Sequence, residues 1–285
     1  MQKSQRTNLW LLLIVLVLII LLYLPTTETV TPESEQRLHG INTNTVTNIH
    51  LQRGPNDQIV LEKRDGEWWM TSPLHWPANR SRVQSLLKLL RQPYYGKFTN
   101  KELDLIRYGL QPPVASIRFN QSHFDFGSTE ALNNLRYLQF GDQIYLVEDH
   151  VFYNVIAIVP RYLSTQLFRK DEKITALNLP GLNLQQKDGR WQSSDMKGHA
   201  DDTIRLIQAW QSAVALSVDI DDKTSIKNKP IIKLGLNSQT APVEFAIIQQ
   251  QPDLLLLRLD NRLLYQLHPH QALQLLNTAA SQYNE

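Results

Sequence analysis

Residues 48–90 read NIHLQRGPNDQIVLEKRDGEWWMTSPLHWPANRSRVQSLLKLL. Apolar side chains stand at alternate positions in three short runs: Ile49 and Leu51, Ile59 and Leu61, and Trp68 and Met70. This alternation is typical of strands with one buried face. Asp65-Gly66 separates the last two runs, and both residues tolerate the positive φ that a tight hairpin turn requires. The stretch therefore predicts three strands, of which the last two form a hairpin.

A helix is expected directly after these strands. Pro73 and Pro77 end the strand pattern, and Ser81 with Gln84 three residues later resembles a capping box. Apolar residues then follow at the spacing of one helix face: Val83, Leu86, Leu87 and Leu90. The sequence thus predicts an amphipathic helix that begins at Ser81.

The same order of features returns about 123 positions later. Asp188-Gly189 and Trp191 correspond to Asp65-Gly66 and Trp68, and Asp201 or Asp202 could cap a second helix. Beyond the helices, Gly109-Leu110 corresponds to Gly235-Leu236. We therefore expect an α+β fold of two tandem repeats, each an antiparallel sheet with amphipathic helices, over residues 41–170 and 171–285.

The amino terminus carries the features of a membrane anchor. Leu9 to Leu24 contains no charged residue and as a helix would span roughly 24 Å, slightly less than the ~30 Å hydrocarbon core. A cleaved signal peptide is the alternative, but residues 22–27 offer no small residues spaced for cleavage. We expect residues 1–25 to form a cytoplasmic start and transmembrane helix, and residues 26–40 to form a tether.

The charge distribution around this segment indicates its orientation. Lys3 and Arg6 precede it, whereas the next basic residue after it is Arg37. The positive-inside rule then places the amino terminus in the cytoplasm. Everything after Pro25 would then lie outside the cytoplasm, which in a Gram-negative cell means a single-pass inner-membrane protein with a periplasmic carboxy-terminal domain.

Composition excludes several kinds of site. The chain has no cysteine, so it has no disulfide, no thiolate nucleophile and no cysteine-ligated zinc. Its 29 basic residues nearly balance 27 acidic ones, so the charge does not single out nucleic acid as a partner. No phosphate-binding glycine-rich loop or nucleophile elbow is present either.

Two short clusters contain side chains that bind metals. His268 and His270 flank a proline but have no third ligand near them in sequence, so a turn is the favoured interpretation. Asp219, Asp221 and Asp222 lack the glycine and distal glutamate of an EF-hand loop, which favours a solvated acidic loop within 219–230. The sequence predicts no catalytic residue, no metal site and no cofactor.

Tryptophans supply the one candidate interaction surface. Trp68 and Trp69 are adjacent in a strand and therefore point to opposite faces, so that Trp68 enters the core and Trp69 does not. With Trp76 nearby, Trp69 could present an aromatic patch to a glycan or a protein partner. The alternative is that the following helix or loop covers Trp69.

Two further helices are expected. Residues 151–168 are apolar enough for a helix that Pro160 must start, kink or divide. Residues 271–283 are a plausible closing helix. The charged segment 169–173 is expected to connect the two repeats.

Several motifs together resemble a known family. They are the Gly66-Glu67-Trp68 end of the hairpin, the run at 108–113, Phe126-Gly127, Arg136 to Leu138 with Ile144 to Leu146, and Phe168 to Lys170. In order and spacing they are similar to the domain of unknown function 4340, over most of 45–175. The resemblance implies a bacterial envelope protein with an amino-terminal membrane helix, and some relatives occur in auxiliary subunits of ABC-type transport systems linked to gliding motility. It supplies no catalytic residues.

The leading hypothesis is a single-pass, membrane-anchored extracytoplasmic binding or assembly module of an envelope complex, for which the resemblance suggests association with an ABC transporter. It is expected not to be an enzyme, and its partner is an unidentified envelope protein. The alternative is a periplasmic protein that binds or acts on cell-wall glycan. Carboxylates converging in a pocket, such as Glu148, Asp149 or Asp171, would favour the enzyme, whereas an uncovered strand edge or apolar patch would favour assembly.

Overall fold

The computed structural model describes residues 16, 38, 41–102, 104–193 and 200–276. The expected transmembrane helix from Leu9 to Leu24 lies outside these residues, apart from Leu16. Within the described part, no helix is both long and apolar enough to cross a bilayer.

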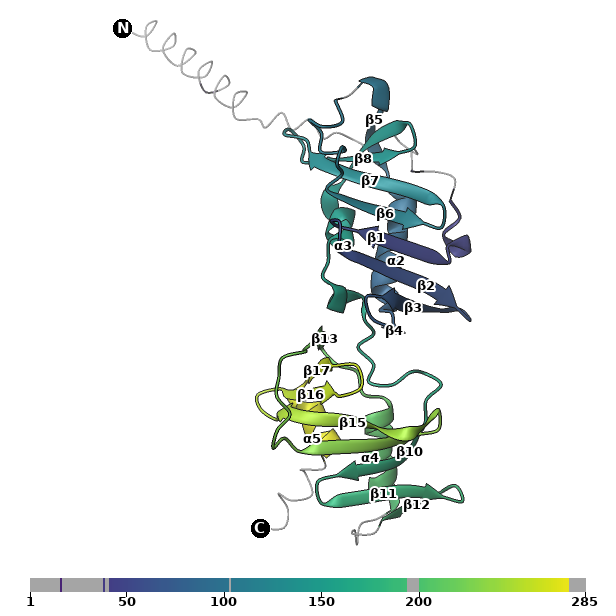
Figure 1. The fold of residues 1–285 in the computed structure, drawn as a ribbon, viewed down its shortest axis with the longest axis vertical. Helices are drawn as coiled ribbons and strands as arrows, with labels where there is room; N and C mark the ends of the chain where they lie inside the picture. The colour runs from purple at the N-terminus through teal and green to yellow at the C-terminus, as the bar shows by residue number, and fades with distance from the viewer. Residues whose placement is uncertain (1–15, 17–37, 39–40, 103, 194–199, 277–285) are drawn as a thin grey trace, which may run out of the picture.

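The first half of the chain forms a nine-stranded antiparallel sheet (Figure 1). Its strands, in spatial order, are β4 (Trp76–Pro77), β3 (Glu67–Ser72), β2 (Gln58–Arg64), β1 (Asn48–Gln52), β6 (Ala115–Phe119), β7 (Ser122–Thr129), β8 (Arg136–Phe140), β9 (Gln143–Val147) and β5 (Tyr94–Thr99). The helices of this half are α2 (Arg80–Leu87) and α3 (Phe152–Val155), with 3₁₀ turns η1 (Thr43–Thr45), η2 (Lys88–Arg91), η3 (Asn100–Glu102), η4 (Asp149–Val151) and η5 (Val159–Tyr162).

The second half forms an eight-stranded antiparallel sheet. In spatial order its strands are β12 (Arg190–Ser193), β11 (Leu182–Lys187), β10 (Ile174–Leu179), β14 (Ile231–Leu236), β15 (Gln239–Gln249), β16 (Leu254–Arg258), β17 (Leu263–Leu267) and β13 (Ser217–Ile220). Its helices are α4 (Ala200–Gln211) and α5 (Pro269–Leu276).

Apart from β4, the two sheets have the same topology. Each begins with three antiparallel strands and a helix, continues as a four-stranded meander, and is completed by the strand after the helix, which pairs with the last strand of the meander. Both hairpin turns have the expected backbone, with positive φ at Asp65 and Gly66 and again at Asp188 and Gly189. The expected α+β class with two antiparallel sheets is confirmed.

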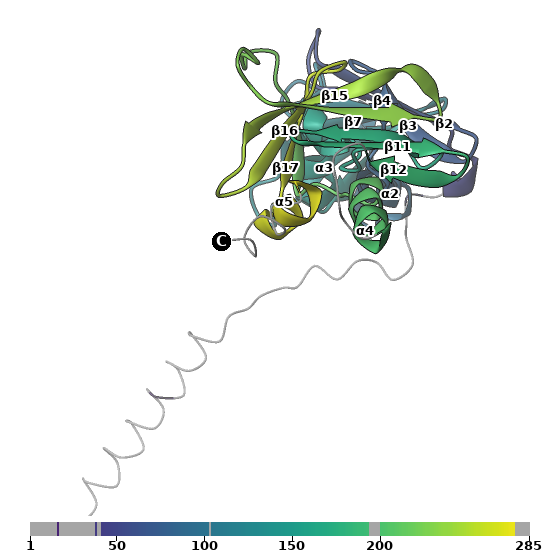
Figure 2. The same ribbon diagram turned by 90° about the horizontal axis from the view of Figure 1, so that it is seen from below.

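Each sheet buries one face beneath its helices. In β1, Ile49 and Leu51 are fully buried while the alternate residues are half-exposed, and α2 buries Val83, Leu86 and Leu87. Seen along the long axis, α2, α4 and α5 lie on the same side of the strands (Figure 2). The fully buried Trp210 donates from its indole nitrogen to the carbonyl of Leu275 at 2.9 Å, which ties α4 to α5.

Several local expectations were wrong. The cap of α2 is Asn79, whose side chain accepts hydrogen bonds from the amides of Ser81 and Arg82, so the helix begins before Ser81. The prolines after β3 do not end the sheet, because Trp76 and Pro77 pair with Met70 and Trp69 as β4. Asp219 belongs to β13, so the acidic loop begins after Ile220.

The helix expected over 151–168 is found only in part. It is divided into the short helix α3 and the 3₁₀ turn η5, and after Tyr162 the chain is extended. Pro160 lies in the first turn of η5, where its fixed φ is tolerated, but its missing amide disfavours a continuous helix from α3 through this position. The closing helix is α5, which ends at Leu276 in the described residues.

Candidate functional site

The segment between the two halves bonds to both of them. We call residues 163–167 the linker. On one side Leu163 forms a bridge with Ala78, and the amide of Ser164 donates to the carbonyl of Pro77 at 2.8 Å. On the other side Gln166 forms a bridge with Val214. The linker therefore acts as a strand between the edge of the first sheet and the segment that leads into β13.

A buried arginine reinforces this junction. Arg258, at the end of β16, is 3% exposed and makes a two-pronged ion pair with Asp260, at 2.8 and 3.0 Å. Its guanidinium also donates to the carbonyl of Leu167 at 3.0 Å and lies 4.6 Å from the ring centroid of Trp76. One side chain of the second sheet thus contacts the linker and the first sheet.

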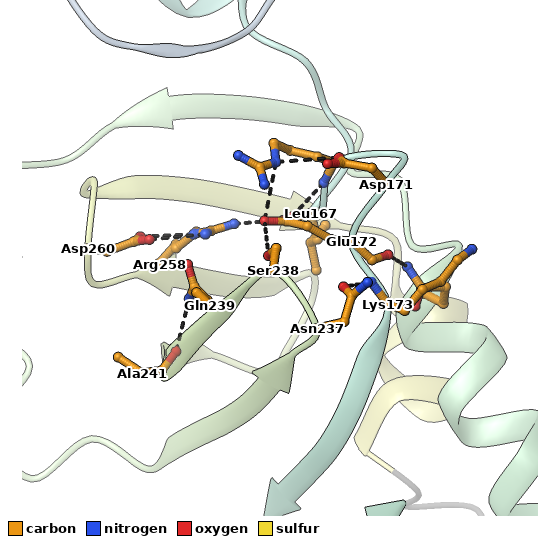
Figure 3. A network of polar contacts seen from close by, with 12 residues as sticks. Leu167, Asp171, Glu172, Lys173, Asn237, Ser238, Gln239, Ala241, Arg258 and Asp260 are labelled. Atoms are coloured by element: carbon orange, nitrogen blue, oxygen red, sulfur yellow. Dashed lines mark hydrogen bonds and ion pairs between the residues drawn. The ribbon is translucent and has the colours of Figure 1, made fainter. Parts of the chain in front are cut away.

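A buried carboxylate anchors the chain where the second half begins (Figure 3). Glu172 is 3% exposed, accepts a hydrogen bond from the amide of Arg169 at 2.8 Å, and accepts another from the hydroxyl of Ser238 at 3.2 Å. Beside it, the side chain of Asn237 accepts from the amide of Lys173 at 2.6 Å. These bonds fix residues 169–173 against the turn between β14 and β15.

A groove of about 890 Å³ opens beside the linker. Its walls come from the hairpin of β2 and β3, from the start of α2, and from the linker with residues 169–171. Most of its side chains are polar or charged, and Trp69 is its most exposed aromatic residue. Separate parts of the chain therefore converge on this groove.

The middle part of the chain matches a known family model. Residues 68–203 match the model described as Domain of unknown function (DUF4340). This match assigns residues 68–203 to the DUF4340 family. No curated protein and no solved structure matches the chain. The DUF4340 match begins in β3 and ends in α4, so it includes the whole linker and most of the groove.

The two tryptophans singled out in the sequence lie in different environments of the DUF4340 region. Trp69 is half-buried, lines the groove, and stacks on His75 with ring centroids 5.2 Å apart. Trp76 is only 7% exposed, because β4 carries it into the junction beneath Arg258. The candidate surface is therefore corrected to Trp69 with the groove, and Trp76 is a core residue.

The side chains considered as metal ligands have local roles. His268 accepts from the amide of His270, and Asp221 accepts from the amides of Lys223 and Thr224, which are turn interactions. That turn, through the Thr224 hydrogen bonds, lowers the pKa of Asp221. In the described part of the chain, no group of three or more potential metal ligands is present.

The carboxylates considered for catalysis are engaged separately. Asp149 pairs with Arg136, whereas Asp171 lines the groove and pairs with Arg169. Glu148 accepts a hydrogen bond from the hydroxyl of Tyr95, which raises the pKa of that tyrosine to about 12. Of the three, Asp171 alone lines the groove.

Two features needed for an assembly role are present. The outer edges of β5 and β12 have no strand partner among the described residues. Exposed apolar side chains also flank the junction: Ile158, 62% exposed, precedes η5, and Leu216, 59% exposed, precedes β13. Sequence reasoning missed both residues, because only the packing of η5 against β13 brings their segments together.

Proposed function

We propose that the chain is a single-pass, membrane-anchored module that binds an envelope protein outside the cytoplasm and acts in assembly rather than in catalysis. The observation that carries the proposal is the junction. The linker bonds to both halves, so two sheets form one extended body with exposed apolar residues and with outer edges that have no strand partner among the described residues. Such a body suits the presentation of a long surface to a partner.

The point where the amino-terminal segment joins the domain supports this arrangement. Leu38 is 6% exposed, and its amide donates to the carbonyl of Gln92 at 3.1 Å, just before β5. Strand β5 is the edge of the first sheet farthest from β4 and the second sheet. A membrane helix at Leu9 to Leu24 would therefore hold the body by one end, with the second half directed away from the bilayer.

Association with an ABC-type transport complex is the partner class that the family resemblance suggests. The alternative of glycan binding is supported by the groove, whose residues are mostly polar or charged. It is not supported by an arrangement of catalytic groups. A glycan-acting enzyme is not favoured by the separate positions of Glu148, Asp149 and Asp171.

The partner proposal is tested by co-purification of the full-length chain from membranes in mild detergent. We expect defined membrane proteins to co-purify, and we expect Leu216→Arg or Ile158→Arg to reduce their recovery because a charge would enter an apolar contact. Leu132→Arg is the matched control, since Leu132 is 88% exposed in the loop between β7 and β8, away from the junction. Recovery of no specific protein, or equal recovery with all three variants, would contradict the proposal.

A further inference from the structure

We propose that the groove beside the linker binds an oligosaccharide that carries carboxylate groups, so that the module contacts cell-wall glycan as well as a protein partner. This proposal rests on the extracytoplasmic location proposed above. The volume of the groove, about 890 Å³, is within the range of small-molecule sites in proteins.

Trp69 provides the aromatic surface of the site. His75 stacks nearly parallel to the indole, at 11°, and does not line the groove, whereas Trp69 is one of its lining residues. The Arg169 guanidinium is 6.0 Å from the Trp69 ring centroid. A sugar ring has an apolar C–H face that packs on such an aromatic surface, while its hydroxyls reach the polar walls.

Unused polar groups surround this tryptophan. The hydroxyls of Ser81 and Thr165 and the side-chain amide of Gln166 line the groove and have no hydrogen-bond partner among the described residues. Asp65 and Glu67 line the hairpin side and supply acceptors. Sugar hydroxyls both donate and accept, so a wall with mixed donors and acceptors fits them.

Two cations of the groove are also free. Arg64 is paired with Glu62, and Arg169 is held by Asp171 and Glu172. Arg80 and Lys170 are exposed, line the groove, and have no ion-pair partner in the part of the chain that the structure describes. They can therefore pair with carboxylates on the ligand.

Other ligand classes fit less well. A bound peptide relies on apolar pockets for its anchor side chains, whereas most of the residues that line this groove are polar or charged. Nucleic acid needs a strong excess of positive charge, whereas Asp65, Glu67 and Asp171 share the groove with the four cations and the whole chain carries only +2.

The test is calorimetric titration of the full-length chain in detergent micelles with two probes of equal length. One is an oligomer of alternating N-acetylglucosamine and N-acetylmuramic acid, which carries carboxylates, and the other is a neutral N-acetylglucosamine oligomer. We expect the acidic oligomer to bind more tightly. Trp69→Ala should weaken binding of both about tenfold or more, and the double change Arg80→Ala with Lys170→Ala should remove the preference for the acidic one.

Controls separate this proposal from its alternatives. Tyr153→Ala removes an aromatic ring that is 64% exposed outside the groove, and it should leave binding unchanged. Trp69→Ala also removes the contact with His75. Gln166→Ala, at an exposed position, therefore provides a second groove variant, and it should weaken binding too.

Absence of binding, or binding insensitive to the groove variants, would overturn the site. Equal affinity for the two probes would overturn the acidic ligand. Neither result would affect co-purification of a protein partner, which tests the proposed function separately.

Discussion

Tyr162 and Tyr265 are both fully buried, but their hydroxyls have different environments. The hydroxyl of Tyr162 donates to the carbonyl of Asn154 in α3, whereas the hydroxyl of Tyr265 is buried and has no hydrogen-bond partner in the part of the chain that the structure describes. Tyr162→Phe should therefore lower the free energy of unfolding by about 1 kcal/mol, and Tyr265→Phe should leave it unchanged or raise it. Urea denaturation of both variants measures this difference, and an equal loss in the two would contradict the assigned hydrogen bonds.

Tyrosine ionisation gives the stability a defined pH dependence. The hydrogen bond to Glu148 raises the pKa of Tyr95 to about 12, and burial raises the pKa values of Tyr162 and Tyr265 above the ordinary 10. Because the folded state holds these protons more tightly, their contribution is complete below pH 10 and is lost as the pH rises toward 12. The urea midpoint should fall over this range, and less steeply in Tyr95→Phe. If the urea midpoint of Tyr95→Phe fell with pH as steeply as that of the unchanged protein, the hydrogen bond between Tyr95 and Glu148 would be contradicted.

Among the structural elements, helix α2 has two candidate capping residues: Ser81, expected from the sequence pattern, and Asn79, observed in the structure. Asn79→Ala should destabilise the protein by about 1 kcal/mol, because the amides of Ser81 and Arg82 lose their acceptor. Ser81→Ala is the matched control and should cost much less, since its hydroxyl has no hydrogen-bond partner among the described residues. Thermal or urea unfolding checks the pair, and a larger loss for Ser81→Ala would favour the cap expected from sequence.

Elements defined by neighbouring residues were predictable, and those defined by distant partners were not. Asp65-Gly66 and Asp188-Gly189 encode their turns locally, so the hairpins and the repeat could be found from sequence. Strands β5 and β13 were missed because their residues acquire strand geometry by pairing with β9 and β17. The linker was missed because the bonds that keep it extended come from Pro77 and from residues 213–215.

The candidate site was only partly predictable for the same reason. The alternation in β3 correctly separates Trp68 from Trp69, because the two faces of a strand are a local property. The burial of Trp76 depends on Arg258, far away in sequence, and the groove combines three separate segments. Such convergence is a property of the tertiary fold, which periodicity does not encode.

At the scale of the whole molecule, Arg258 joins the two halves. Arg258→Met should cost roughly 2 kcal/mol, because the buried carbonyl of Leu167 loses its donor and Asp260 loses its partner. Arg118→Met, at an exposed position in β6, should cost less than about 0.5 kcal/mol. Limited proteolysis should also cut the linker faster in Arg258→Met, and an unchanged cleavage rate would contradict the role of Arg258 at the junction.

The location of the two sheets tests the proposed function most directly. A phosphatase reporter that is active only outside the cytoplasm is fused after residue 285, in the intact chain and in a chain whose residues 9–24 are replaced by a cleavable signal peptide. We predict activity from both fusions, with the intact chain in the membrane fraction and the replaced chain in the soluble fraction. An inactive reporter on the intact chain, or an active one found only in the soluble fraction, would contradict a membrane-anchored extracytoplasmic module.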